Sequence, residues 1–279
     1  MKRDRTNFMH AARSATWVAS AVLGFGATVA PKVVRAIVAA LTATIGIAHG
    51  ATDAAMLDRL GVRPGKWKIS IAYGVVAIAT YLVARRYPVA AARALRLVSW
   101  AHFGSGDAAF ARACGSRRPE LAESFVRGGI PLSIGGRDAR SAWSFIAASS
   151  YAALTATGRS GIADSVDVAV PSAVLYAAPA RLGFGVYFAA WHAPRHLALL
   201  LERDVRGGPY VDRFRRFARE AAPNVAIAGA FGALAYALRG PSDGAEELVG
   251  ALILGITVPH QIAVWIIEYR SRASASAAS

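Results

Sequence analysis

The sequence has almost no cysteine, and this scarcity limits the chemistry that the protein can perform. Cys114 is the only cysteine among the 279 residues. A single thiol excludes an internal disulfide and a cluster of thiolate ligands. Any metal site in this chain must therefore be built from nitrogen and oxygen ligands.

The apolar runs contain no lysine, and the chain lacks the residue patterns of two classes of membrane enzyme. The four lysines, Lys2, Lys32, Lys66 and Lys68, lie near the terminus or in loops between apolar runs. This excludes a photoreceptor that binds its chromophore through a Schiff-base lysine within a membrane helix. The H-E-x-x-H motif of membrane zinc proteases is absent. Six histidines are too few for the histidine-rich site of a membrane di-iron desaturase.

Acidic residues are scarce, but the excess of basic residues does not indicate a nucleic-acid partner. The chain has 32 Lys and Arg against 17 Asp and Glu, a net charge of +15. In a soluble protein this balance would suggest binding to nucleic acid. Here 55% of the residues are hydrophobic, the mean hydropathy is +0.37, and the basic residues lie in short segments between apolar runs. That pattern is typical of topology signals in a multi-pass membrane protein, and we predict no nucleic-acid partner.

Long apolar runs recur throughout the chain and predict an all-α, polytopic transmembrane helical bundle of about eight spans. The predicted spans cover residues 16–30, 33–57, 69–84, 89–111, 141–157, 180–201, 223–238 and 247–269. Glycine and proline interrupt two other segments. We therefore expect a surface or re-entrant loop over 119–135 and an irregular piece or half-helix over 166–180.

The distribution of basic residues predicts the orientation of this bundle. An even number of spans puts both termini on one side of the membrane, and the segments on that side carry more Lys and Arg. Both termini are therefore predicted to be cytoplasmic, in a multi-pass protein of the plasma membrane. We expect a cytoplasmic N-terminal segment over 1–15, the bundle over 16–269 and a disordered tail over 270–279. The first apolar run has no convincing cleavage site, so no cleavable signal peptide is expected.

The run from Tyr187 to Leu201 contains two histidines at helical spacing. His192 and His196 are four residues apart, so on a helix both imidazoles would lie on one face and could bind one metal ion. Pro194 between them frees a carbonyl group and kinks the helix at a cost in stability. The alternative is that both histidines, together with Arg195, hydrogen-bond to neighbouring helices.

Five of the six histidines fall at one predicted depth in the membrane. They lie in four predicted spans that all run toward the cytoplasm, six to ten residues before the first charged residue of the following loop, with Asp53 and Asp107 assigned to the site itself. This places them roughly 9 to 15 Å from the cytoplasmic helix ends. Ionisable groups at membrane depth are costly and usually functional, so we predict a metal site in preference to a purely structural polar layer. The five residues are His49, His102, His192, His196 and His260.

Two aspartates closely follow two of these histidines. Imidazole suits zinc, iron, copper and nickel, so the residues alone do not select the metal. Asp53 follows His49 by four residues. Asp107 follows His102 by five, with two glycines between them that suggest a local distortion or a helix end. We favour both aspartates as acceptors of the free ring N–H of a metal-bound histidine. Direct ligation, or an ion pair with Arg195 or another buried arginine, are the alternatives.

Five short motifs, four in the predicted spans and one in the predicted loop 119–135, resemble those of a known family. They are HGATD (His49–Asp53), HFGSGD (His102–Asp107), RGGIP (Arg127–Pro131), WHAPRH (Trp191–His196) and VPH (Val258–His260). In this order, over residues 45–268, they resemble the Brp/Blh family, whose characterised members are membrane-embedded, iron-dependent β-carotene 15,15'-dioxygenases. The chain departs from the family pattern at Ala48, where the family has proline, and at Ala54, where a histidine is expected.

The resemblance implies a reaction and a set of site residues. Iron(II) would direct O2 onto the central 15,15' double bond of β-carotene to give retinal, so the implied partners are the lipid bilayer, the carotenoid, O2 and a retinal-binding rhodopsin. The implied iron ligands are His49, His102, His192 and His196, with His260 near the site or as a further ligand. The residues expected to support these ligands are Asp53, Asp107 and Arg195. The candidate walls of a substrate tunnel are Phe103, Phe184, Tyr187, Phe188, Trp191 and Trp265.

A non-enzymatic function is the main rival to this interpretation. A membrane carrier of carotenoid or retinal, or a proton-coupled transporter, could use the layer of histidine and aspartate to bind ligand or relay protons without redox chemistry. Stoichiometric iron would favour the oxygenase, whereas a metal-free preparation that binds a polyene would favour the carrier.

Overall fold

The computed structural model describes residues 2–133, 158–239 and 245–276, and in these ranges the chain forms helices and no strand. The predicted all-α class is confirmed for this part of the chain. Internal contacts divide the chain into two compact units. The first unit comprises Met1–His49 and Trp100–Glu202, and the second comprises Gly50–Ser99 and Arg203–Ser279. Each unit is described by itself.

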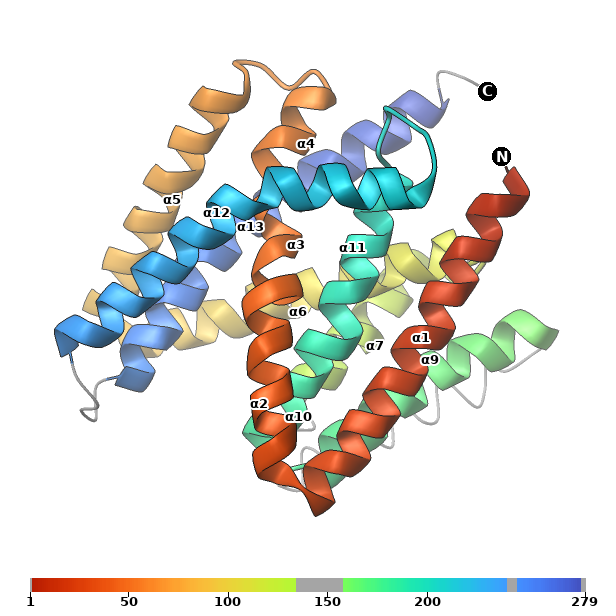
Figure 1. Cartoon of the computed structure of the whole chain (residues 1–279), viewed down its shortest axis with the longest axis horizontal. Coiled ribbons are helices and arrows are strands. Elements are labelled where there is room, and N and C mark those ends of the chain that lie inside the picture. Colours follow the sequence, from red (N-terminus) through yellow and green to blue (C-terminus); the bar gives the residue numbers. More distant parts are fainter. Residues whose placement is uncertain (1, 134–157, 240–244, 277–279) are drawn as a thin grey trace. The chain divides into compact units, whose positions relative to one another are not determined.

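The first unit is built from helices that pack around an aliphatic core. Its elements are α1 (Lys2–Val29), α2 (Pro31–Leu41), the π-helix η1 (Thr42–Gly46), the start of α3 (Ile47–Ala51), the second half of α6 (Pro88–Ala113), α7 (Glu120–Ser133), α9 (Gly158–Ala177), α10 (Ala180–Val186), the π-helix η3 (Tyr187–His192) and α11 (Ala193–Glu202). Helix α1 lies along α9, and α2 packs beside α10 (Figure 1). Valine, leucine and alanine side chains fill the space between α1, α2, α9, α10 and η3.

Two glycines bring α6 and α7 into direct backbone contact. A Cβ atom at Gly104 would lie 2.0 Å from the carbonyl oxygen of Ser124, and one at Gly128 would lie 2.1 Å from that of Trp100. The indole Nε1 of Trp100 also donates a hydrogen bond of 2.9 Å to the carbonyl of Phe125. Only residues without a side chain permit this approach, so α7 lies directly against the second half of α6.

The first unit contains two π-helical segments, and a histidine of the candidate site lies at or near the end of each. Segment η1 comes just before His49, and η3 ends at His192. The two segments pack against each other, and Gly46 permits the contact, since a Cβ there would lie 2.8 Å from the ring of Phe188. Pro194 falls in the first turn of α11, where its missing amide coincides with the change from π to α geometry. Short π segments of this kind are frequent at functional sites.

The second unit is a smaller helical assembly. Its elements are α4 (Asp53–Arg59), α5 (Lys66–Arg86), the first half of α6, α12 (Tyr210–Arg239) and α13 (Ala245–Ser276). Helix α13 packs along α5, and both contact α4 (Figure 1). Ala84 lies at the centre of a small apolar cluster with Tyr81, Ala91, Leu95 and Val258. This unit carries the fifth histidine of the predicted layer on α13.

Two segments that we expected to be irregular are helical. Residues 120–133, within the predicted loop 119–135, form α7. The segment 166–180 was expected to be broken, but α9 continues through Pro171 and ends only at Ala177. A proline removes one backbone hydrogen bond, and the packing of α9 against α1, α7 and α10 compensates for that loss.

Both ends of the predicted bundle continue as helix. Helix α1 begins at Lys2, so residues 2–15 are helical and continuous with the first apolar run, and the cytoplasmic location of this segment stays a prediction. The tail expected to be disordered over 270–279 is helical as far as Ser276, in agreement with the high helix propensity of its alanines. Residues 277–279 and the predicted span 141–157 lie outside the described part of the chain.

Two helical stretches of the described chain are long and apolar enough to cross a membrane. They are Pro31–Arg59, with a mean hydropathy of 1.6, and Lys66–Arg86, with a mean hydropathy of 1.5. Length and composition alone support this assignment, and a buried helix of a soluble protein can meet the same criteria.

Candidate metal centre

Four buried histidines of the first unit meet at one place. They come from four elements, with His49 on α3, His102 on α6, His192 at the end of η3 and His196 on α11, and they are between 1% and 7% exposed. The closest ring centroids, those of His102 and His192, are 4.7 Å apart, and the most distant, those of His102 and His196, are 6.3 Å apart. The ring of His49 lies 5.4 to 6.2 Å from the other three. Four imidazoles this close can surround one ion.

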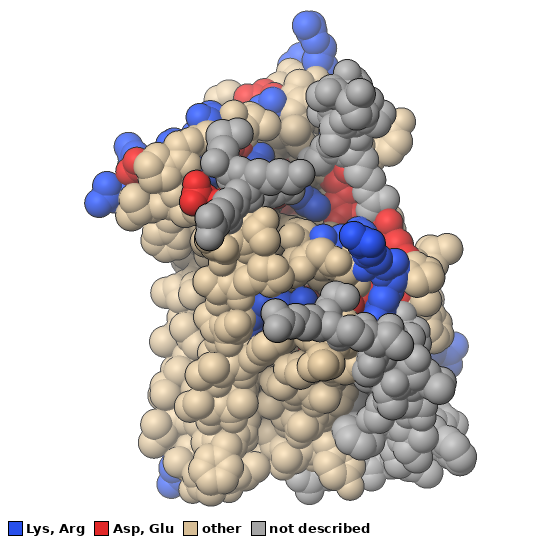
Figure 2. All heavy atoms as spheres, turned by 90° about the vertical axis from the view of Figure 1, so that its right-hand side faces the viewer, with Lys and Arg blue, Asp and Glu red and all other residues tan. Residues whose placement is uncertain are grey.

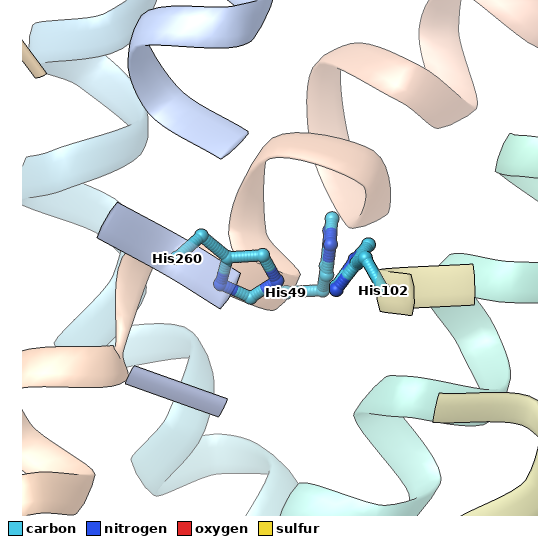
Figure 3. A group of neighbouring side chains, drawn as sticks. All are labelled: His49, His102 and His260. Atoms are coloured by element: carbon cyan, nitrogen blue, oxygen red, sulfur yellow. The ribbon is translucent and has the colours of Figure 1, made fainter. Parts of the chain in front are cut away.

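The ring nitrogens of these residues fit a shared metal. Nε2 of His102 lies 3.0 Å from Nε2 of His192, and two nitrogens bound at right angles to one ion at about 2.1 Å would be about 3.0 Å apart. The same distance would allow an N–H···N hydrogen bond without metal. Nδ1 of His49 faces the carbonyl oxygen of Gly46, which assigns the proton to Nδ1 and leaves Nε2 as the ligand atom. Figure 3 shows the His49 and His102 rings, which offer ring nitrogens within 4.8 Å of each other.

Asp107 lies beside the histidine of a neighbouring helix. Its Oδ2 accepts hydrogen bonds from the hydroxyl of Tyr187 at 3.2 Å and from Nε1 of Trp191 at 3.0 Å, and its Oδ1 is 3.8 Å from Nδ1 of His192. The distortion expected before Asp107 is absent, because α6 is a continuous helix through this region. Gly106 provides room for the imidazole, since a Cβ there would lie 3.3 Å from Cε1 of His192.

Arg195 binds an aspartate that the sequence reasoning missed. The alternative given above pairs it with Asp53 or Asp107, but its NH2 group donates to Oδ1 of Asp167 at 2.7 Å. Its guanidinium also lies 3.5 Å from the ring centroid of Trp191. A charged residue within an apolar run is the signal by which Asp167 could be found from the sequence.

Asp167 belongs to a buried network of ion pairs. Its partners besides Arg195 are Arg13 on α1 and Arg127 on α7. Asp164 and Glu123 complete the network through further contacts with these arginines. All of these side chains are at most 3% exposed, and buried charges are tolerated only when they are paired in this way.

Aromatic side chains lead from the surface of the first unit to the histidines. Phe184 is 38% exposed, and its ring lies 5.9 Å from that of the buried Phe103. The ring of Phe103 lies 5.4 Å from that of Tyr187 and 4.7 Å from that of His192. The ring of Phe188 lies 5.6 Å from that of His49 and 6.2 Å from that of His192. These four aromatic residues of the predicted tunnel wall therefore adjoin the site.

The two tryptophans of the predicted tunnel wall occupy different positions. Trp191 is completely buried, with the guanidinium of Arg195 against its ring, so this indole is a packed part of the core. Trp265 is 50% exposed on α13 of the second unit.

Asp53 and His260 form a pair within the second unit. Oδ2 of Asp53 lies 2.6 Å from Nδ1 of His260, which Figure 3 also labels. Both residues are at most 3% exposed, and Gly50 makes room for the ring, since a Cβ there would lie 3.0 Å from Nδ1. The histidine beside Asp53 is therefore His260, and the predicted role of Asp53 as an acceptor for a metal-bound histidine stays a prediction.

Comparison with known proteins gives a consistent result. A family model described as beta-carotene 15,15'-dioxygenase matches residues 40–135 and 140–268. The chain is also 26% identical over 326 aligned residues to a protein of Halobacterium salinarum named as a probable beta-carotene 15,15'-dioxygenase Blh, covering 95% of this chain and 94% of that protein. No solved structure matches the chain.

Proposed function

The chain belongs to the β-carotene 15,15'-dioxygenase family, and from this premise we propose that it cleaves a carotenoid with O2. The proposed substrate is β-carotene, the proposed bond is the central 15,15' double bond, and the product is retinal. The observation that carries the proposal is the convergence of four buried imidazoles from four helical elements within 6.3 Å of one another.

The proposed ligands of iron(II) are His49, His102, His192 and His196. Bound iron(II) would supply the site at which O2 is activated. Both oxygen atoms enter the products and one C=C bond becomes two C=O bonds, so the reaction needs no external reductant and no general base. The side chains therefore have to hold the metal, orient the polyene and exclude water. His260 is outside this set.

Aromatic packing supports an elongated apolar substrate. We propose that the polyene lies along Phe184, Phe103 and Tyr187 and that Phe188 borders the site beside His49. Phe184 is the most exposed member of this group, at 38%, which suits entry of a substrate directly from lipid. Aromatic faces bind conjugated chains by dispersion and stacking without requiring polar groups on the ligand.

Exposed apolar stripes support a membrane location. On α1, Val18, Val22, Phe25 and Val29 are 62% to 71% exposed at helical spacing. On α5, a similar stripe is formed by Ile71, Val75, Ile78 and Leu82, which are 58% to 62% exposed. Soluble proteins rarely expose contiguous apolar patches of this kind. Broad areas of uncharged residues, drawn in tan, are visible among the described residues on the face in Figure 2. We propose a multi-pass protein of the plasma membrane with about eight spans, cytoplasmic termini and a product that supplies a retinal-binding rhodopsin.

Expression in bacteria that accumulate β-carotene tests this function. We expect the cells to lose their orange colour and to accumulate retinal, because central cleavage shortens the conjugated chain. Pigments extracted from the cells would be separated by chromatography and quantified. Unchanged pigments in several carotenoid backgrounds, despite verified expression, would contradict the proposal.

Metal analysis of the purified protein separates the oxygenase from the carrier or transporter. We expect about one iron per chain, removable by a chelator together with activity and restored by iron(II). A preparation that binds β-carotene or retinal stoichiometrically but binds no metal would instead support the non-enzymatic alternative.

Replacing Asp107 with asparagine should weaken metal binding without unfolding the protein. The change removes the negative charge that faces Nδ1 of His192 and keeps the size of the side chain. Loss of a carboxylate that supports a metal-bound histidine typically costs about 10- to 100-fold in metal affinity or activity. Tyr187→Phe is the matched control for metal affinity, because it removes one donor to Asp107 and leaves the carboxylate, and iron content is compared among the three proteins. Equal retinal formation by wild type and Asp107→Asn would refute this role.

A further inference from the structure

The helical stretch that carries His192 and His196, from η3 into α11, lacks the regular backbone hydrogen bonds that would keep it straight. Segment η3 ends at His192, and Pro194 lacks an amide hydrogen. Both features interrupt the regular α-helical hydrogen bonds and permit bending or rotation. One residue of helix corresponds to a rotation of about 100°, so a modest rotation of α11 would turn His196 away from the other imidazoles. Contacts to neighbouring helices must therefore fix its orientation.

Arg195, between the two histidines in sequence, makes such contacts. It is 1% exposed. Its NH2 group donates to Oδ1 of Asp167 at 2.7 Å, and its Nε donates to Oγ1 of Thr16 at 3.0 Å. Its guanidinium lies 3.5 Å from the ring centroid of Trp191. A planar guanidinium held at its edge and its face cannot rotate without losing these contacts, so it ties α11 to α9 and α1.

Asp167 is fixed in turn by three further donors. Its Oδ1 also accepts from Nε1 of Trp17 at 2.6 Å, and its Oδ2 accepts from Arg13 at 2.7 Å and from Arg127 at 3.3 Å. The side chain is 1% exposed. Hydrogen bonds to this carboxylate from two helices, α1 and α7, make it a rigid anchor for Arg195.

A continuous set of contacts leads from this anchor to the imidazole of His192. The guanidinium of Arg195 packs on Trp191, and Nε1 of Trp191 donates to Asp107 at 3.0 Å. The other oxygen of Asp107 lies 3.8 Å from Nδ1 of His192. A shift of Arg195 would therefore displace both the helix and the acceptor beside His192.

We infer that Asp167 is a positioning residue for the metal site. Through Arg195 it fixes the orientation of α11 about its axis, and this orients the His192 and His196 side chains toward a shared ion. This inference rests on the proposed function. Asp167 acts through Arg195, and its contacts are with Arg195, Trp17, Arg13 and Arg127.

Asp164 provides a matched control on the same helix. It is also buried, at 2% exposed, and it also binds Arg13, at 2.6 Å. Its other contacts in the described part of the chain are with Ser116, Arg118 and Arg127, none of which lies on α11. Loss of either carboxylate therefore leaves Arg13 short of a partner, but only loss of Asp167 releases Arg195.

The test compares purified full-length wild type, Asp167→Asn and Asp164→Asn. Each protein is titrated with Co(II), whose absorption spectrum reports the geometry of its ligands, and its thermal unfolding is measured. We expect both variants to unfold at lower temperature than wild type. Only Asp167→Asn should bind Co(II) about tenfold more weakly and show an altered absorption spectrum.

Equal Co(II) affinities and spectra for the two variants would overturn the inference. If Asp167→Asn does not fold, Arg195→Lys is tested in its place. This variant keeps the positive charge beside Asp167 but loses the hydrogen bond to Thr16 and the planar contact with Trp191. It should fold and show the same spectral change, and an unaltered spectrum would again overturn the inference. Failure of the wild type to bind any Co(II) or iron would instead refute the proposed function, and the inference with it.

Discussion

Replacement of His192 by alanine should abolish retinal formation in cells that accumulate β-carotene. Its ring is close to all three other imidazoles, with centroids 4.7 to 6.2 Å away, and Nε2 is 3.0 Å from Nε2 of His102. Removal of one of four proposed ligands should reduce activity by more than the about 10- to 100-fold that follows loss of a residue supporting a ligand. Retinal would be measured in cell extracts, and iron in the purified variant.

His10→Ala is the control for this experiment. His10 is the one histidine outside the predicted layer, and its side chain is exposed on α1. Its replacement should leave retinal formation and iron content unchanged. If His192→Ala still formed retinal at the wild-type rate while remaining folded, His192 could not be a ligand and the proposed site would be wrong.

Among glycine-to-alanine substitutions in the described part of the first unit, Gly104→Ala should have the largest effect on folding. The new Cβ would lie 2.0 Å from the carbonyl oxygen of Ser124. Because the obstacle is backbone, α6 and α7 would have to separate along their length. Overpacking a well-packed contact typically costs about 1 to 3 kcal/mol and occasionally more, against a total stability of about 5 to 15 kcal/mol. We expect a marked fall in the yield of monodisperse protein and in its unfolding temperature.

Gly74→Ala tests whether this effect is specific to the crossing of α6 and α7. Nothing lies within 4 Å of a Cβ at Gly74, and alanine is a better helix former than glycine. This variant should unfold at or above the wild-type temperature. Equal unfolding temperatures for Gly104→Ala and Gly74→Ala would show that the two helices tolerate separation.

The histidine cluster could be anticipated because its signal is local. Each imidazole stands in an apolar run, and counting residues to the end of each predicted span places the histidines at one depth. Four of the five, His49, His102, His192 and His196, do come together in the first unit. The role of the fifth, His260, depends on the second unit, where its contact is Asp53.

The buried ion pairs could not be anticipated in the same way. Arg13 and Asp167 are 154 residues apart in the chain, and no local pattern links them. Their pairing depends on the packing of α1 along α9 and on α9 remaining helical through Pro171. A proline in an apolar run usually predicts a break, and here tertiary contacts override that local preference.

The π-helical segment η3 makes the length of the chain before His196 as important as its composition. A π turn is in effect an α-helix with one additional residue. Loss of one alanine from Tyr187–His192 would therefore convert η3 to regular α geometry and leave the faces of the flanking helices nearly unchanged. Loss of Ala193 from the α-helical turn that follows would instead turn His196 by about 100° relative to His192. Relatives that keep all four histidines are therefore expected to tolerate a one-residue difference within η3 but to lose the centre if the length between His192 and His196 changes.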